Sequence, residues 1–212
     1  RALDIVFGDR YSFCVINTSE VIKLSKKEIK RLVERFYNDT YLVDQNACSS
    51  PHLVVWLGKK VDKARNKFWR HLHYHVNKKY ILTETASLDK YTQLCSHILS
   101  LNNLKKYELY NNSIYTIFLK NLDKNIHELR GKWGFFYEYN INDLNKMKNY
   151  INNKYQTLTY FGLNKSILKN FILKNQLEGI DRIVPIGQAL DIGFFWDGYD
   201  LNRILSRVVD IK

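Results

Sequence analysis

Apolar residues along the chain fall into short continuous runs and longer stretches with helical spacing. The short runs predict buried strands at 2–7, 11–17, 53–57, 114–119, 134–139, 157–162 and 180–187. The helical spacing predicts helices at 27–41, 59–80, 87–101, 144–153, 165–176 and 201–209. Strands that alternate with helices in this way favour an α/β fold, in which helices cover both faces of a mostly parallel sheet and give three layers.

A lone cysteine lies between the first long helix and the strand that follows it. The polar residues 44–51 (D-Q-N-A-C-S-S-P) separate these two elements, and Pro51 cannot continue a helix. We therefore expect Cys48 at a sharp bend between a helix and a strand. A thiol at such a bend can meet a ligand while nearby backbone N–H groups bind an oxyanion. The alternative is that Cys48 is an inert, small apolar residue.

Length and composition limit the kind of protein this is. A chain of 212 residues with 45% hydrophobic residues suits one domain with a sizeable core. The cysteines Cys14, Cys48 and Cys95 form no disulfide pattern, which predicts reduced thiols in a cytoplasmic protein. No apolar run reaches the roughly 18 to 20 residues of a membrane span. Because Arg1 leads directly into a strand-like run, we expect residues 1–212 to be a single domain of a longer protein.

The net charge of +12 raises the question of a nucleic-acid partner. The lysines are scattered and come with many Asn, Ile and Tyr residues, a composition that an AT-rich coding sequence produces. No RNP-type aromatic motif, zinc finger or arginine-rich arm accompanies them. We therefore expect no nucleic acid, although the basic field favours acidic ligands such as nucleotide phosphates. A basic binding module without catalysis stays open as a distant alternative.

Three histidines in the predicted helix over 59–80 suggest a metal site at first sight. His71 and His75 share one helical face, and His73 lies between them. No acidic residue or cysteine stands beside them at ligand spacing, and their neighbours are lysine and arginine. We expect no metal here and interpret the three residues as a solvated helix flank.

Two segments carry a resemblance to a known family. Residues 47–51 (A-C-S-S-P) and 179–207 (G-I-D-R-I-V-P-I-G-Q-A-L-D-I-G-F-F-W-D-G-Y-D-L-N-R-I-L-S-R) resemble the long-chain acyl-CoA and acyl-protein thioester reductases. This family includes the fatty acid reductase subunit that makes aldehyde for bacterial luciferase. The order of elements around Cys48 is similar, more distantly, to the catalytic domain of aldehyde dehydrogenases. The resemblance implies an aldehyde-dehydrogenase-like catalytic domain, with a nucleotide-binding domain preceding Arg1.

The resemblance also implies roles for individual residues. Cys48 matches the nucleophile that accepts the acyl group as a thioester, and Asn46 and Gln45 are expected to help shape the oxyanion site. Glu128 matches a glutamate that hydrogen-bonds the nicotinamide ribose, although Arg130 stands where an aromatic residue is usual. A plain turn carboxylate is the alternative for Glu128.

Three arginines are candidates for assisting Cys48, although the sequence alone does not place them. Arg10, Arg182 and Arg203 could lower the pKa of its thiol or bind phosphate.

The implied reaction is the NADPH-dependent reduction of a long-chain fatty acyl thioester to aldehyde through an acyl-cysteine. The phosphate-binding pattern G-x-G-x-x-G is absent, so most of the NADPH site is expected in the preceding domain. The family implies a homo-oligomer that docks acyl-protein synthetase and acyl-transferase subunits.

The direction of the reaction is implied by a second comparison within the family. Hydrolytic aldehyde dehydrogenases carry a water-activating glutamate in an E-L-G-G segment, and here Ile5 or Val6 fills that place. This predicts a reductase, with an aldehyde-oxidising dehydrogenase as the nearest alternative.

Overall fold

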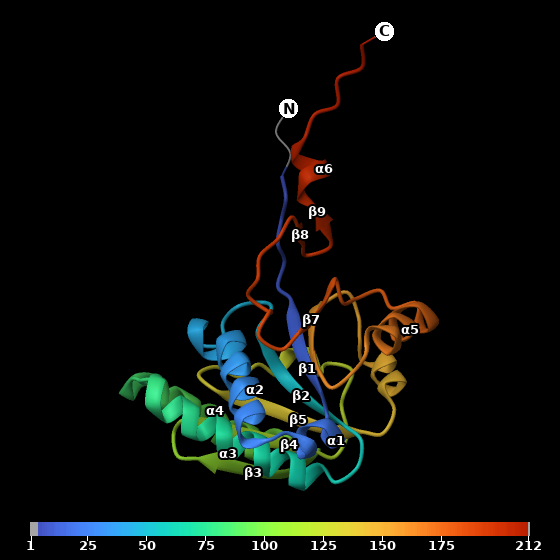
Figure 1. Ribbon diagram of the computed structural model, residues 1–212. Coiled ribbons are helices and arrows are strands. Elements are labelled where there is room, and N and C mark those ends of the chain that lie inside the picture. Colours follow the sequence, from blue (N-terminus) through green and yellow to red (C-terminus); the bar gives the residue numbers. More distant parts are fainter. Residues whose placement is uncertain (1–3, 212) are drawn as a thin grey trace.

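The computed structural model describes residues 4–211, which form a seven-stranded sheet with helices on both faces (Figure 1). The strands are β1 (Tyr11–Asn17), β2 (Pro51–Leu57), β3 (Leu104–Tyr110), β4 (Ile114–Leu119), β5 (Phe135–Ile141), β6 (Tyr155–Phe161) and β7 (Arg182–Pro185). Their order across the sheet is β3-β4-β5-β2-β1-β6-β7. Every neighbouring pair is parallel except β3 and β4, so the predicted mostly parallel sheet is confirmed.

Two separate hydrophobic clusters lie on the two faces of this sheet. The helices are α1 (Thr18–Lys23), α2 (Lys26–Thr40), α3 (Val61–Lys79), α4 (Glu84–Ser100), α5 (Lys165–Asn175) and α6 (Leu201–Leu205). Side chains of α1, α2 and α3 pack on one face, and those of α4 and α5 pack on the other. In β1, Phe13 and Val15 join the α4/α5 cluster, whereas Cys14 and Ile16 join the opposite one. Burial on both faces explains the continuous apolar runs and confirms the three layers.

The structure differs from the sequence prediction at several elements. The expected strand over 2–7 is absent from residues 4–7, which have no regular secondary structure, and residues 1–3 lie outside the described part. The edge strand β3 was missed because three of its seven residues are exposed and the other four are only partly buried, so no buried apolar run marks it. In place of the helix over 144–153 there is a short 3-10 helix, Leu144–Asn149, because Asn152 turns the chain by accepting the Lys154 N–H.

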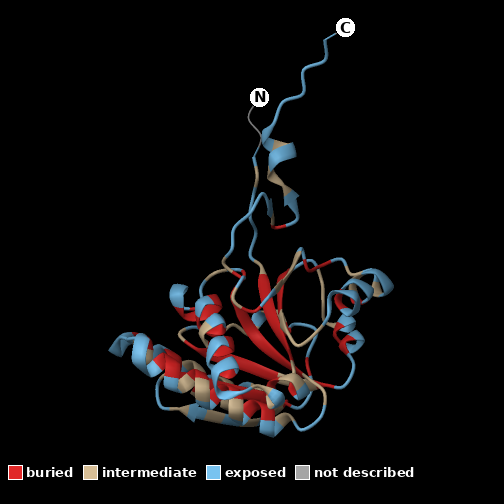
Figure 2. Cartoon of the chain, viewed as in Figure 1, coloured by how far each residue is buried: buried red, intermediate tan, exposed pale blue. Residues whose placement is uncertain are grey.

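The C-terminal segment leaves the body of the domain and runs beside the N-terminal residues (Figure 1). It contains the short hairpin of β8 (Phe195–Trp196) and β9 (Tyr199–Asp200), followed by α6, which ends at Leu205 and so is shorter than the predicted helix over 201–209. Residues 191–211 form this projecting arm, which is largely exposed (Figure 2). Its exposed apolar side chains are Ile192, Phe194, Phe195, Leu205, Val208, Val209 and Ile211.

No helix among residues 4–211 combines the length and the apolar character that a membrane crossing requires.

Candidate active site at the amino edge of the sheet

Cys48 lies in a turn just before β2, at the edge of the sheet where the parallel strands begin. After the 3-10 helix Tyr41–Val43, Asp44 and Gln45 adopt left-handed backbone conformations that reverse the chain. The N–H of Ser50 then donates to the carbonyl of Ala47 at 2.9 Å and closes the turn. The Cys48 side chain is exposed, and the predicted bend between a helix and a strand is confirmed.

The side chain of Gln45 fixes the position of this turn through hydrogen bonds. Its buried side-chain Nε2 donates to the carbonyls of Pro51 (3.1 Å) and Phe135 (3.0 Å). Its Oε1 accepts the N–H groups of Gly134 and Phe135, each at 3.1 Å. Both amide hydrogens are therefore used within the protein, so Gln45 fixes the position of the turn and cannot itself donate to an oxyanion. This contact joins the Cys48 turn to the start of β5.

Ser12 anchors the backbone of Cys48 to β1. The buried Ser12 Oγ donates to the Cys48 carbonyl at 2.6 Å and accepts the N–H of Thr157 on β6 at 3.1 Å. The pairing register of β1 shifts beside Ser12, an irregularity that frees its neighbourhood from regular ladder bonds. Sequence reasoning missed this residue, because a serine within a buried strand carries no local signal of its partner.

Backbone N–H groups around Cys48 are free to receive a ligand. Within residues 4–211, the N–H groups of Ala47, Cys48 and Ser49 donate to no protein acceptor. Free N–H groups next to a nucleophile are the donors that stabilise a developing oxyanion. Asn46 is exposed in the same turn, directly before these residues.

The three cysteines differ in accessibility. Cys14 is completely buried in β1, and burial raises the pKa of its thiol far above the ordinary value. Cys95 is half-buried on α4. Cys48 is exposed, which makes it the most accessible thiol of the three.

The turn that contains Glu128 lies at the same edge of the sheet. Glu128 ends a 3-10 helix (Ile126–Glu128), and its exposed side chain lies just before β5, which pairs with β2. Arg130, in the same turn, pairs with Asp9 at 3.0 Å and lies over the ring of Tyr11. Glu128 and Cys48 therefore share one edge.

His52 connects this turn to β2. Burial lowers the pKa of His52 to about 3, so its ring is neutral at ordinary pH. Its Nδ1 lies 3.0 Å from the carbonyl of Gly131, which can only accept, so the proton is on Nδ1. Gly131 itself is required, because an added Cβ would lie 1.8 Å from the carbonyl oxygen of Phe135.

Of the three candidate arginines, two contact the C-terminal segment and the third lies within it, away from the Cys48 turn. Arg10 pairs with Asp197 at 2.6 Å and with Asp181. Arg182 donates to the carbonyls of residues 188, 189 and 191 and lies over the ring of Trp196. Arg203 is on α6, in the projecting arm. None of their contacts involves Cys48.

The three histidines of α3 do not gather around a common point. His71 Nδ1 lies 2.7 Å from the Lys67 carbonyl, and His73 Nδ1 lies 2.7 Å from Ser113 Oγ. His75 is buried against Tyr37, so the expectation of a solvated flank is wrong for this residue. Among residues 4–211 there is no group of three His, Cys, Asp or Glu side chains that could hold a metal ion.

Solved structures with a similar fold are aldehyde dehydrogenases. Aldehyde dehydrogenase 21 from Physcomitrella patens, in complex with succinate, shares 10% identity over 86% of this chain and 39% of its own, with a TM-score of 0.55. An NAD-dependent benzaldehyde dehydrogenase from Corynebacterium glutamicum shares 8% identity over 83% of this chain and 39% of its own, with a TM-score of 0.52. A 1-pyrroline-5-carboxylate dehydrogenase from Thermus with bound NAD shares 8% identity over 82% of this chain and 35% of its own, with a TM-score of 0.51.

The fold is therefore that of the aldehyde dehydrogenase catalytic domain, and the chain spans less than half the length of these enzymes. No curated protein matches the sequence. The family model described as acyl-CoA reductase (LuxC) matches residues 1–207, which is nearly the whole chain. The chain belongs to the acyl-CoA reductase (LuxC) family.

Proposed function

We propose that this chain is the thioester-forming domain of an enzyme that reduces long-chain fatty acyl thioesters to aldehydes. The observation that carries the proposal is the turn around Cys48, where an exposed thiol is flanked by free backbone N–H groups. Membership of the acyl-CoA reductase family supports the same reaction. The substrate is an acyl-CoA or an acylated partner protein.

In the first step, the Cys48 thiolate attacks the carbonyl carbon of the acyl thioester. A new C–S bond forms, the carbonyl becomes an oxyanion, and its collapse breaks the old C–S bond and releases the carrier thiol. The N–H groups of Cys48 and its neighbours stabilise the oxyanion. The bond from Ser12 and the contacts of Gln45 keep these groups in place during the step.

The second step needs a reductant, and we propose NADPH, which supplies a hydride when bound. This chain fits one part of such a cofactor, because the exposed Glu128 carboxylate lies at the Cys48 edge and can accept hydrogen bonds from ribose hydroxyls. Addition of the hydride to the carbonyl carbon of the acyl-cysteine would give a second oxyanion, which the same N–H groups would hold; its collapse would break the C–S bond, releasing the aldehyde and Cys48 as a thiolate. Structures of similar fold were solved with NAD, which supports a nicotinamide cofactor.

The proposal extends to the domain organisation, the oligomeric state and the partners of the enzyme. Residues 1–212 would be a single catalytic domain, preceded by a nucleotide-binding domain, which agrees with a chain that spans less than half of the similar dehydrogenases. The exposed apolar arm would contribute to a homo-oligomer. Acyl-protein synthetase and acyl-transferase subunits would supply the acyl group in the cytoplasm, and the aldehyde would serve bioluminescence.

The test is the intact mass of the complete enzyme after incubation with a long-chain acyl-CoA without NADPH. We expect one acyl adduct, which is lost in Cys48→Ala and kept in the matched variant Cys95→Ser. NADPH should then discharge the adduct as aldehyde. An adduct that persists in Cys48→Ala contradicts the proposal, and discharge as free acid without NADPH would favour an aldehyde-oxidising dehydrogenase. Retention on a polyanion column without any adduct would favour a basic binding module.

A further inference from the structure

Asp39, in the last turn of α2, has a buried carboxylate that the steps proposed for Cys48 do not use. The residue is 1% exposed, and the partners of its carboxylate within residues 4–211 are two backbone N–H groups. Oδ2 accepts the N–H of Gly187 at 2.6 Å, and Oδ1 accepts the N–H of Ala189 at 2.9 Å. A buried carboxylate is costly unless donors surround it, and these donors come from 148 and 150 residues further along the chain. The carboxylate therefore joins α2 to residues 186–189, which we call the arm root because they lie just before the projecting arm.

The arm root packs directly against α2. Gly187 has a φ of +99°, and an added Cβ would lie 2.7 Å from the Cβ of Arg35, which is one turn before Asp39 on this helix. A glycine is therefore needed for the arm root to lie this close to α2. Arg182 of β7 donates to the carbonyls of residues 188, 189 and 191. The N–H groups of this part of the chain thus bond to α2, whereas its carbonyl groups bond to β7.

The same end of α2 holds both ends of the turn that carries Cys48. Before Cys48, the N–H of Gln45 donates to the carbonyl of Thr40 at 2.7 Å. After Cys48, the buried Ser50 Oγ donates to the carbonyl of Asp39 at 2.7 Å. Because the nucleophile lies between these two contacts, a displacement of the last turn of α2 would shift the turn that carries it.

We propose that Asp39 is a positioning residue for Cys48. Its side chain fixes the end of α2 on the arm root, and the carbonyl groups of that end fix the turn around the nucleophile. A displacement of about 1 Å at a reacting group can cost about a hundredfold in rate, so this link bears directly on acylation. The effect on acylation rests on the reaction proposed for Cys48, whereas the mechanical link between the arm root and the turn does not.

The link should have a characteristic dependence on pH. Burial raises the pKa of Asp39 to about 7; the Asp191 carboxylate acts in the same direction, and the two N–H groups and Arg182 oppose it. Cys14 of β1 also faces Asp39, with a thiol that burial keeps protonated, and Arg35 lies one turn earlier on α2. When the arm root opens, the carboxylate meets water and its pKa returns to the ordinary value. Opening therefore releases a proton between about pH 4 and pH 7, and it should become easier as the pH rises through this range.

The first experiment is hydrogen exchange of the complete enzyme without substrate, followed from about pH 5 to pH 8 and corrected for the chemical exchange rate. In the unmodified enzyme, exchange of the N–H groups of Gly187 and Ala189 should accelerate by up to about tenfold per pH unit below pH 7 and level off above it. The N–H groups of Gln45 and Ser50 should follow the same profile, because their turn moves with the arm root. In Asp39→Asn, whose side chain cannot titrate, this dependence on pH should be absent at all four positions.

The second experiment measures single-turnover acylation of Cys48 by a long-chain acyl-CoA. Asp39→Ala leaves the two arm-root N–H groups without an acceptor and should slow acylation at saturating acyl-CoA about tenfold or more. The acyl-CoA concentration that gives half the maximal rate should stay unchanged, because the residue does not touch the substrate. Gly187→Ala pushes the arm root away from α2 and should have a similar effect. The double variant should be no slower than the slower single variant, because both changes break the same contact.

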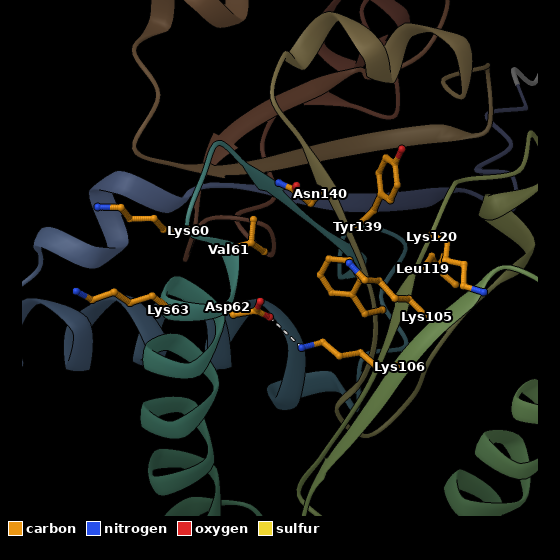
Figure 3. A pocket seen from close by; sticks show the side chains of 11 residues that line it. Lys60, Val61, Asp62, Lys63, Lys105, Lys106, Leu119, Lys120, Tyr139 and Asn140 are labelled. Carbon is orange, nitrogen blue, oxygen red and sulfur yellow. Dashed lines mark hydrogen bonds and ion pairs between the residues drawn. The ribbon is translucent and has the colours of Figure 1, made fainter.

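Two carboxylates outside this network provide controls. Asp62 pairs with Lys106 at 2.9 Å beside a cavity of about 800 Å³ at the opposite edge of the sheet (Figure 3). Asp62→Asn should therefore leave both the exchange of the turn and the acylation rate unchanged. Glu138→Gln removes a buried carboxylate that is bonded to α3 and controls for a general loss of stability. It should leave the pH profile of the turn as it is in the unmodified enzyme.

Three outcomes would overturn the proposal. They are exchange of the turn that does not follow the arm root with pH, an unchanged profile in Asp39→Asn, and losses of acylation rate that multiply in the double variant. If the exchange results are as expected but Cys48 of the unmodified enzyme takes up no acyl group, the link between the arm root and the turn is supported and the reaction proposed for Cys48 is wrong.

Discussion

Arg65 of α3 and Glu138 of β5 form a bidentate ion pair that is completely buried between the helix and the sheet. The Arg65 Nε and Nη2 atoms lie 2.7 Å and 2.5 Å from the two carboxylate oxygens. The indole N–H groups of Trp56 and Trp69 donate to the same carboxylate at 2.6 Å and 2.9 Å. Four donors therefore compensate the buried charge of Glu138 and hold α3 on the sheet.

Glu138→Gln should lower the free energy of unfolding by about 3 to 5 kcal/mol, because the buried Arg65 guanidinium loses its one buried counter-charge and keeps only the longer contacts to Glu108 (3.4 Å) and Asp62 (3.5 Å). Glu108→Gln removes a partly exposed carboxylate 3.4 Å from Arg65 and should cost less than about 1 kcal/mol. Urea denaturation of both variants measures the difference. Similar losses of unfolding free energy in the two variants would show that the buried pair of Arg65 with Glu138 contributes no more to stability than the contact of Arg65 with Glu108.

Ser12→Ala should slow acylation of Cys48 about tenfold or more, because the carbonyl of the nucleophile loses its anchor and the turn shifts. Thr18→Val removes a comparable hydroxyl, which donates to the carbonyls of Leu57 and Lys59 at the other edge of the sheet. Both variants should lose about 1 to 3 kcal/mol of stability. Single-turnover acylation rates distinguish the positioning of Cys48 from a general contribution to stability. Equal rates in both variants would contradict the positioning role of Ser12.

Glu128→Gln should raise the KM for NADPH by roughly tenfold, since a charged acceptor of ribose hydroxyls is replaced by a neutral one. The rate of Cys48 acylation should stay unchanged, because that step precedes the use of the cofactor. Glu84→Gln, on the exposed first turn of α4, is the charge-matched control. An unchanged KM in Glu128→Gln would leave this residue as a plain turn carboxylate.

Lys90 gives stability an unusual dependence on pH. Its buried ammonium donates to the carbonyls of Asn112 (2.9 Å) and Trp133 (2.7 Å), and burial lowers its pKa to about 7. Between pH 7 and about 10 the unfolded chain binds a proton that the folded protein does not, so stability should rise with pH. The difference in unfolding free energy between the unmodified protein and Lys90→Met should grow over this range. Parallel pH profiles would show that Lys90 stays charged when folded.

The acyl-enzyme should persist when NADPH is withheld. Neither Ile5 nor Val6 can accept a proton, and general-base assistance to water is typically worth about 10² to 10⁴-fold. Val6 is exposed and Ile5 half-buried, so neither is a core strand residue. Release of free fatty acid is followed in the unmodified enzyme, with Ile5→Glu and Val6→Glu as the variants in which hydrolysis should accelerate. Rapid release from the unmodified enzyme would indicate a water-activating base elsewhere.

Much of the fold could be predicted because its signals are local. The apolar runs of β2 and β4 and the helical spacing of α3 depend on neighbours within one element. The bend at Cys48 followed from Pro51 and the polar residues before it. The edge strand β3 and the irregular residues 4–10 were not predicted, because their structure depends on how far each is covered by the rest of the molecule.

The α/β class, the helix-to-strand bend at Cys48 and the resemblance to the acyl-CoA reductases could all be inferred from the sequence alone. The groups that surround Cys48 are known only from the folded protein: the hydroxyl of Ser12, 36 residues away along the chain, and the backbone of Phe135, which Gln45 contacts from 90 residues away. The fold also placed Arg10 and Arg182 against the C-terminal segment. Periodicity along the sequence indicates which side chains face water and which face the core. Contacts between residues far apart in the sequence form only when the whole chain folds.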